Sequence, residues 1–217
     1  MRSKSKAAWL LSTVLLALLI TLPLAGCITS VSTAEETQAP EDRAADLEAQ
    51  LLARVQYFRE NATNLANLIH QGINNKRRDS GLQPLTWDQQ LANIALSHSR
   101  DMAERDYFDH VSPEGEDFAD RYEDYNYSKD TRVGNQVYVG GENLFLNNVV
   151  GSYTYDDLTG EVFEYRFNDL EELAQSTVDG WMDSPGHREN ILTPFSREGI
   201  GIIVTDEGEV YITENFS

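Results

Sequence analysis

The chain has 217 residues, of which 41% are hydrophobic, so it is long enough for one domain with an ordinary hydrophobic core. Its formal net charge of −19 argues strongly against nucleic-acid binding, because such a surface repels phosphate groups. The charge is also consistent with a salty habitat or with cation binding. A single cysteine excludes a disulfide within the chain, so stability must come from packing.

Residues 1–27 have the pattern of a lipoprotein signal peptide. Three basic residues precede an apolar run from Ala7 to Ile20, and Leu24-Ala25-Gly26-Cys27 resembles a lipobox. The apolar run is shorter than the roughly 20 residues that a membrane span needs, although a transmembrane helix is the alternative. We therefore expect cleavage before Cys27, a lipid on Cys27, and a membrane-anchored protein at the extracellular surface.

Three further segments follow the leader. Residues 28–46 are rich in Ser, Thr, Ala, Glu and Pro, which predicts a flexible tether. Residues 47–63 have apolar side chains at helical spacing and form a helical lead-in, and residues 64–217 form the main domain. Two helices open that domain, at 64–78 and at 87–104, the second capped by Thr86 with Gln89. We interpret His70 and His98, which lie on these helices, as ordinary packed residues.

His110 and Glu142 are the first candidate site residues. His110 follows the second helix, in a segment between two aromatic residues and a Pro and Gly turn. Glu142 follows two glycines, which favour a close backbone approach and could direct the carboxylate into a cleft. The alternative for Glu142 is an ordinary surface carboxylate.

His187 is the third candidate. A helix capped by Asn168 with Glu171 runs to Met182, and we expect Pro185 and Gly186 to end it. His187 would then lie on a rigid corner just past the helix, where an imidazole can bind a ligand or carry a proton. The alternative is that His187 interacts with the end of the helix, where a cation is favoured.

Strands are predicted mainly in the second half of the chain. Residues 137–139 form a short strand, and hairpins are predicted at 149–167 and at 200–216. Helices first and hairpin-connected strands later indicate an α+β or layered αβα domain.

Six segments in order together resemble one known family, over roughly residues 65–216. They are Gly81-Leu82 to Trp87-Asp88; Ala95 with His98-Ser99 and Asp101-Met102; Phe108 with His110, Ser112-Pro113 and Gly115; Gly141-Glu142-Asn143-Leu144; Trp181-Met182 with Ser184-Pro185-Gly186-His187-Arg188 and Asn190-Ile191-Leu192; and Gly199-Ile200-Gly201. This set resembles the CAP superfamily of cysteine-rich secretory, antigen 5 and pathogenesis-related proteins, in its prokaryotic SCP-like form.

The resemblance implies a three-layer αβα sandwich with a mostly antiparallel central sheet and a large cleft. In eukaryotic members two histidines and two acidic residues line the cleft, and some members bind a divalent metal there. His110 matches the first histidine and Glu142 the first glutamate. The second glutamate would fall near Ser184 and the strand histidine near Tyr211, so both are missing here.

Three other features concern the same cleft. We expect His187 of the prokaryotic motif to reach it, and the usual Gln of the last strand is Glu214 here, which adds a carboxylate. The unusual hairpin insertion at about 145–165 directly follows Glu142 and could cover the cleft. Two imidazoles and one carboxylate can hold zinc or another first-row divalent cation, so His110, Glu142 and His187 are our candidate metal ligands, with Ser184, Tyr211 and Glu214 as their neighbours.

Three functions remain open from the sequence. The first is a surface-anchored module whose cleft binds a divalent metal or a small ligand, such as a lipid or a peptide. The second is a metal-dependent, peptidase-like hydrolase of the cell envelope. The third is a non-catalytic lipid-binding or interaction scaffold. A thiol nucleophile is excluded because Cys27 lies in the leader. No catalytic role is assigned, although His110, Glu142 and His187 are the candidates for one, and the oligomeric state is left open.

Overall fold

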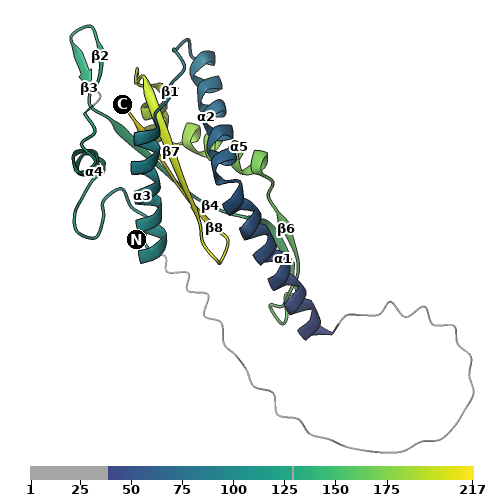
Figure 1. The fold of residues 1–217 in the computed structure, drawn as a ribbon. Coiled ribbons are helices and arrows are strands. Elements are labelled where there is room, and N and C mark those ends of the chain that lie inside the picture. Colours follow the sequence, from purple (N-terminus) through teal and green to yellow (C-terminus); the bar gives the residue numbers. More distant parts are fainter. Residues whose placement is uncertain (1–38, 129) are drawn as a thin grey trace, which may run out of the picture. The chain divides into compact units, whose positions relative to one another are not determined.

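A computed structural model describes residues 39–128 and 130–217 (Figure 1). The signal peptide, Cys27 and most of the predicted tether lie outside this part of the chain. In the described residues no helix combines the length and apolar character needed to cross a bilayer. The account below concerns the compact unit that ends at Ser217.

The N-terminal helix α1 (Pro40–Glu60) begins inside the segment predicted as a tether. Pro40 occupies its first turn, where a proline costs no hydrogen bond, and Glu41 and Asp42 add favourable charge there. Val55 and Phe58 are buried in the main core. The lead-in helix is therefore an integral part of the domain, and it begins at Pro40 and not at residue 47 as predicted.

Two later helices are each capped by an aspartate that the sequence analysis missed. Helix α2 (Ala62–Asp79) is followed by the short strand β1 (Thr86–Trp87) and by α3 (Gln89–Arg105). Asp88, and not Thr86, caps α3, because its side chain accepts from the first backbone N–H groups. Asp169 with Glu172 caps α5 (Leu170–Asp183), one residue later than predicted.

The central sheet has the strand order β1-β7-β8-β4. Strand β8 (Glu209–Phe216) pairs antiparallel with both β7 (Arg197–Val204) and β4 (Gly141–Asn148), and only the two-residue β1 is parallel to its neighbour. Strand β4 therefore forms one edge of the sheet. The predicted α+β class and mostly antiparallel sheet are confirmed.

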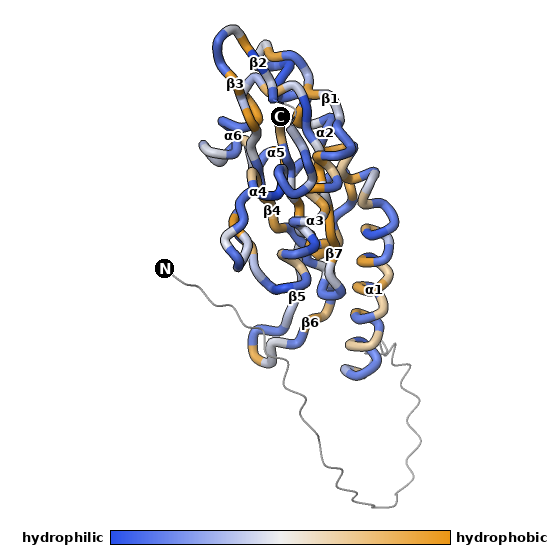
Figure 2. The backbone as a smooth tube through the Cα atoms, turned by 60° about the vertical axis from the view of Figure 1, so that its left-hand side comes forward, coloured by the Kyte–Doolittle hydropathy of each residue, from blue (hydrophilic) through white to orange (hydrophobic). Residues whose placement is uncertain are grey.

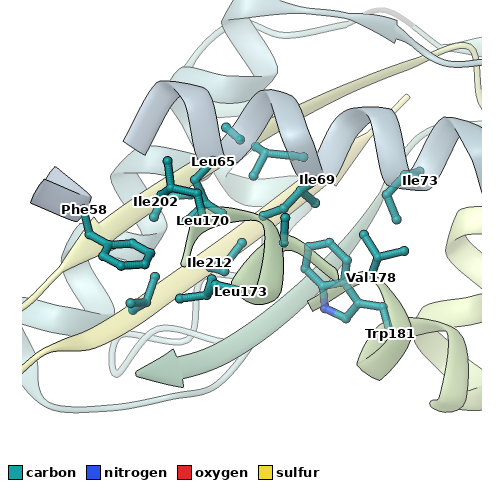
Figure 3. Close-up of a cluster of buried hydrophobic side chains, with 14 of the residues drawn as sticks. Phe58, Leu65, Ile69, Ile73, Leu170, Leu173, Val178, Trp181, Ile202 and Ile212 are labelled. Atoms are coloured by element: carbon teal, nitrogen blue, oxygen red, sulfur yellow. The ribbon is translucent and has the colours of Figure 1, made fainter. Parts of the chain in front are cut away.

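Helices cover both faces of this sheet (Figure 1). Helix α3 lies directly on β7, because a Cβ at Gly199 or Gly201 would come within 2.1 Å and 2.0 Å of backbone atoms of α3. Helices α2 and α5 cover the opposite face and enclose the main core around Ile69, Leu173 and Trp181 (Figure 3). Figure 2 shows the apolar residues concentrated on the strands between these layers.

The remaining elements surround these layers. They are the short helices α4 (Phe118–Asp124) and α6 (Pro185–Leu192), the hairpin of β2 (Thr131–Val133) and β3 (Gln136–Tyr138), and the hairpin of β5 (Val150–Tyr155) and β6 (Val162–Phe167).

The β5–β6 hairpin does not cover the cleft. It begins beyond Asn148, whereas Glu142 lies near the other end of β4. It packs against α1 instead (Figure 1): Arg43 Nη1 donates to Glu161 Oε1 at 2.9 Å, and its guanidinium lies 4.6 Å from the centre of the Phe163 ring. The prediction of a hairpin was right, but the role predicted for it was wrong.

Candidate functional site

His110 lies on the loop that joins α3 to α4. Helix α3 ends with Asp106 in the left-handed conformation, at φ 54°, which turns the chain away from the helix axis. A tight turn then follows His110, with the N–H of Ser112 donating to the carbonyl of Glu116 at 2.9 Å and the N–H of Gly115 to that of Ser112 at 2.9 Å. These bonds fix the loop as the sequence predicted.

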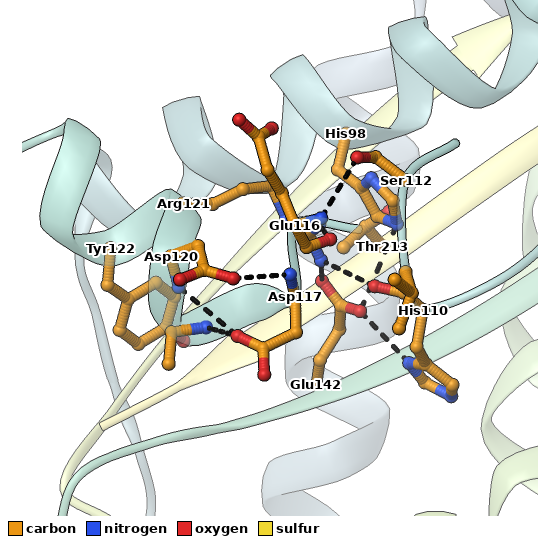
Figure 4. Close-up of polar contacts among 12 residues, drawn as sticks. His98, His110, Ser112, Glu116, Asp117, Asp120, Arg121, Tyr122, Glu142 and Thr213 are labelled. Carbon is orange, nitrogen blue, oxygen red and sulfur yellow. Dashed lines mark hydrogen bonds and ion pairs between the residues drawn. The ribbon is translucent and has the colours of Figure 1, made fainter. Parts of the chain in front are cut away.

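Glu142 forms the centre of the site and is almost fully buried (Figure 4). His110 Nδ1 donates to Glu142 Oε1 at 2.9 Å, and Arg121 Nη2 donates to Glu142 Oε2 at 2.7 Å. The alternative of an ordinary surface carboxylate is therefore wrong. Both carboxylate oxygens have a partner, which compensates the cost of burying the charge.

Arg121 of α4 was not identified from the sequence. Its guanidinium also donates to the carbonyls of Glu116, at 3.0 Å, and of His110, at 3.1 Å. One side chain thus joins helix α4, the His110 loop and the edge strand that carries Glu142. Helical spacing alone could not have placed it in the site, because its partners are 5 to 21 residues away in the sequence.

His98 of α3 lies beneath the same carboxylate, although the sequence analysis treated it as an ordinary packed residue. Its Nε2 is 3.9 Å from Glu142 Oε1 and 3.1 Å from the carbonyl oxygen of Asp109. Because a carbonyl only accepts, this bond places a proton on Nε2. Burial lowers the pKa of His98, so the ring is held neutral.

His187 lies in the first turn of α6 and not on an irregular corner. Ser184 ends α5 and also begins α6, with Pro185 at the first helical position. The proline therefore opens a new helix after ending the previous one. Helix α6 is held against the edge of the sheet because Asn190 Nδ2 donates to the carbonyl of Glu142 at 3.0 Å.

This geometry brings His187 to His110, with 6.2 Å between the two ring centres. Burial, followed by the charge of His110, lowers the pKa of His187. The first turn of a helix disfavours a cation, so the alternative that His187 is a favourable cation at a helix end does not hold. The candidates His110, Glu142 and His187 thus meet at the edge of β4.

The three predicted neighbours of the site have different positions. Tyr211 is on the same sheet face as Glu142, and the centre of its ring lies 6.3 Å from that of Phe108. Ser184 lies at the junction of α5 and α6. Glu214 points to the opposite face of the sheet, because side chains alternate along β8. The expectation that Glu214 neighbours the cleft was therefore wrong.

Two imidazoles are the groups of this arrangement that could hold a divalent cation. Both oxygens of Glu142 are occupied by His110 and Arg121, so this carboxylate orients His110 and is not free to bind a metal directly. Across residues 39–128 and 130–217, no three His, Cys, Asp or Glu side chains are grouped closely enough to hold a metal ion. The donors available are therefore the outer nitrogens of His110 and His187.

The fold and the sequence together identify the family. Residues 70–216 match the Cysteine-rich secretory protein family, CAP, and the chain belongs to it.

Among its relatives are two uncharacterized proteins of Bacillus subtilis. The chain is 30% identical to the membrane protein YlbC over 137 residues, which are 63% of this chain and 29% of that protein. It is 28% identical to YkwD over 144 residues, which are 66% of this chain and 43% of that protein. The match thus spans less than half of either relative.

A solved structure supports the fold. An outer surface protein from Borrelia burgdorferi superimposes with a TM-score of 0.51 and 17% sequence identity, over 71% of this chain and 92% of that one.

Proposed function

We propose that this CAP domain is a ligand-binding module at the outer surface of the cell, and that His110 and His187 bind a divalent cation at its cleft. The observation that carries the proposal is the 2.9 Å hydrogen bond from His110 Nδ1 to Glu142 Oε1. This bond keeps the proton on Nδ1 and leaves the Nε2 lone pair available for a ligand.

Two features prepare the pair of histidines for this role. The side chain of His110 is half exposed, whereas its carboxylate partner is buried, so a ligand can reach the ring without disturbing Glu142. The lowered pKa of His187 keeps that ring neutral, which is the form that binds metals. With only two histidines bound to it, the cation keeps open coordination positions for a further molecule, the ligand of the module. A bound cation would polarise an oxygen of that ligand.

The leader and the relatives support the proposed location. A signal peptide with a lipobox predicts export and a lipid on Cys27. Relatives include a protein named as a membrane protein and a structure named as an outer surface protein. We infer that the domain is exposed outside the cell and connected to the membrane through residues 28–39.

Zinc titration calorimetry on the full chain tests the proposed site. Wild type should bind about one equivalent, His110→Ala and His187→Ala should lose that binding, and Glu142→Gln should weaken it about 10- to 100-fold because it no longer orients His110. Glu189→Gln, at an exposed position on α6, is the matched control and should bind like wild type. Circular dichroism confirms that each variant folds.

The same experiment distinguishes the other two candidate functions. Equal zinc binding by wild type and both histidine variants would reject the metal site, and the cleft would then be tested with lipids and peptides as a non-catalytic scaffold. Zinc binding accompanied by peptide cleavage that His110→Ala and His187→Ala both abolish would establish the hydrolase.

A further inference from the structure

A second group of titratable residues lies on the sheet face opposite the cleft. Glu198 of β7 and Glu214 of β8 are fully buried and lie diagonally across the paired strands. Their carboxyl groups are within hydrogen-bonding reach of each other. Two ionised carboxylates in contact and away from water would repel each other strongly, so this pair requires a proton.

The outer end of this group fixes the proton position on His70. Asn74 accepts from the N–H of Leu85 at 2.7 Å and donates to its carbonyl at 3.0 Å, which identifies Asn74 Nδ2 as the donor atom. The same Nδ2 lies 3.3 Å from His70 Nε2, so Nε2 accepts and His70 Nδ1 carries the proton. His70 Nδ1 therefore donates to Glu198 Oε1.

The hydrogen bonds at the Glu214 end of the pair are also determined. Asn143 Nδ2 donates to Glu214 Oε2 at 3.1 Å, and Asn143 Oδ1 accepts from Asn190 Nδ2 at 2.9 Å. Each outer oxygen of the pair therefore has a donor. Of the carboxyl oxygens buried in the described part of the chain, the two that have no hydrogen-bond partner are Glu198 Oε2 and Glu214 Oε1. One proton between these two atoms would satisfy both.

We propose that Glu198 and Glu214 share one proton in the folded protein and form a buried proton-binding site on the α2 face of the sheet. The site has a carboxyl on one strand donating to a carboxylate on the next, with His70 at its partly exposed outer end. It is separate from the His110 cleft, although Asn143 connects the two by also donating to the carbonyl of His187 at 3.2 Å. This proton-binding site does not depend on metal binding at His110 and His187 or on the family of the chain.

Burial determines the sign of the effect. Burial raises the pKa of Glu198 to about 7, and burial together with Glu198 raises the pKa of Glu214 well above its usual range. The groups that face the pair or His70 come from three elements. They are Arg77, Arg78 and Asn74 from α2, Trp87 from β1 and Asn143 from β4. Arg77 acts against the shift of Glu198, but burial outweighs it.

The pH dependence follows from these raised values. In the unfolded chain both carboxyls ionise near pH 4.3, whereas the folded pair keeps its proton to higher pH. The stability that the proton confers is therefore complete in acid and is lost as the pH rises through the raised pKa values. Between the pKa of the unfolded chain and the raised pKa values of the folded pair, release of one proton should increase the unfolding equilibrium constant by up to about tenfold per pH unit.

Urea unfolding of the full chain between pH 5 and pH 8 tests the proposal. Glu214→Gln places an amide donor opposite Glu198 Oε2 and needs no proton, so it should remove this slope, and Glu198→Gln should do the same. Glu207→Gln makes the same charge change at an exposed position and should keep the slope of wild type. Identical slopes in wild type and both buried variants would overturn the proposal.

Infrared spectroscopy of wild type gives a readout that depends on no variant. A protonated-carboxyl band should persist at pH 6, where ordinary carboxyls are ionised, and should decrease as the pH rises further. Complete absence of this band at pH 6 would also overturn the proposal.

Discussion

At the scale of single residues, the buried ion pair of Glu142 and Arg121 holds the candidate site together. The guanidinium neutralises a carboxylate that has little contact with water, and its other hydrogen bonds hold the His110 loop. Removing one partner of such a pair leaves a buried charge uncompensated, which is more costly than the net contribution of the pair.

We therefore expect Arg121→Ala to lower the free energy of unfolding by about 3–5 kcal/mol. Urea unfolding monitored by circular dichroism measures this loss. Arg105→Ala is the matched control, because Arg105 pairs with Glu114 and Asp101 at the surface, and it should change the stability little. Equal effects of the two substitutions would contradict a special role for Arg121.

His98 should make the protein sensitive to acid. Its pKa is lowered by burial, so the folded state favours the neutral ring, whereas the unfolded chain takes up a proton near pH 6.5. The stability that the neutral ring confers is present above that pH and is lost as the pH falls below it. His98→Gln keeps an N–H donor for the carbonyl of Asp109 but does not titrate in this range.

The measurement for His98 is urea unfolding between pH 5 and pH 7.5. From pH 7.5 to pH 5, the free energy of unfolding of wild type should decrease relative to that of His98→Gln, which keeps the buried carboxyl pair but not the titrating ring. Parallel curves would show that His98 does not contribute to acid sensitivity.

At the scale of elements, much of the fold could be predicted, but the junctions could not. Apolar spacing correctly indicated α2, α3 and the terminal hairpin, because burial of a continuous stripe determines those elements. Pro185 was predicted only to end a helix, whereas it also begins the next one, α6. Arg121 and His98 depend on contacts between elements, which periodicity within one element does not contain.

The contact of α3 with the sheet depends on the glycines of β7. Gly201→Ala would place a Cβ 2.0 Å from the backbone nitrogen of Leu96, and a backbone atom cannot move aside as a flexible side chain can. We expect a loss of at least about 1–3 kcal/mol, because α3 must move outward. Thermal unfolding measures this loss.

Gly186→Ala is the control for this prediction. A Cβ at Gly186 in α6 meets no atom within 4 Å, and alanine favours a helix, so stability should be unchanged or slightly higher. A Gly201→Ala variant as stable as wild type would contradict the direct packing of α3 on β7.

At the scale of the whole unit, the domain extends beyond the segment that matches the family. The match begins at residue 70, whereas α1 begins at Pro40 and contributes Val55 and Phe58 to the main core. The early start of α1 was not predicted, because residues 40–46 have the composition of a linker. Their helical state depends on α1 as a whole, which packs against β6 and the sheet.

The β5–β6 hairpin and the cleft should be independent of each other. Ser152 and Arg166 are paired across the hairpin, so residues 153–165 can be replaced by Asn-Gly, which makes a two-residue turn between them. Because the hairpin contacts α1 at the end of β4 away from Glu142, the shortened protein should retain the zinc affinity of wild type. Its thermal stability should fall modestly, because Arg43 loses Glu161 and Phe163.

Zinc titration of the shortened protein beside His110→Ala tests this independence. Unchanged affinity in the shortened protein, together with loss in His110→Ala, would confine the site to the loop, β4 and α6. Weaker binding by the shortened protein with an intact fold would instead show that the hairpin reaches the cleft in solution. It would then contribute to the binding surface, because an insertion beyond the end of β4 can affect the site only by contacting it or by displacing that strand.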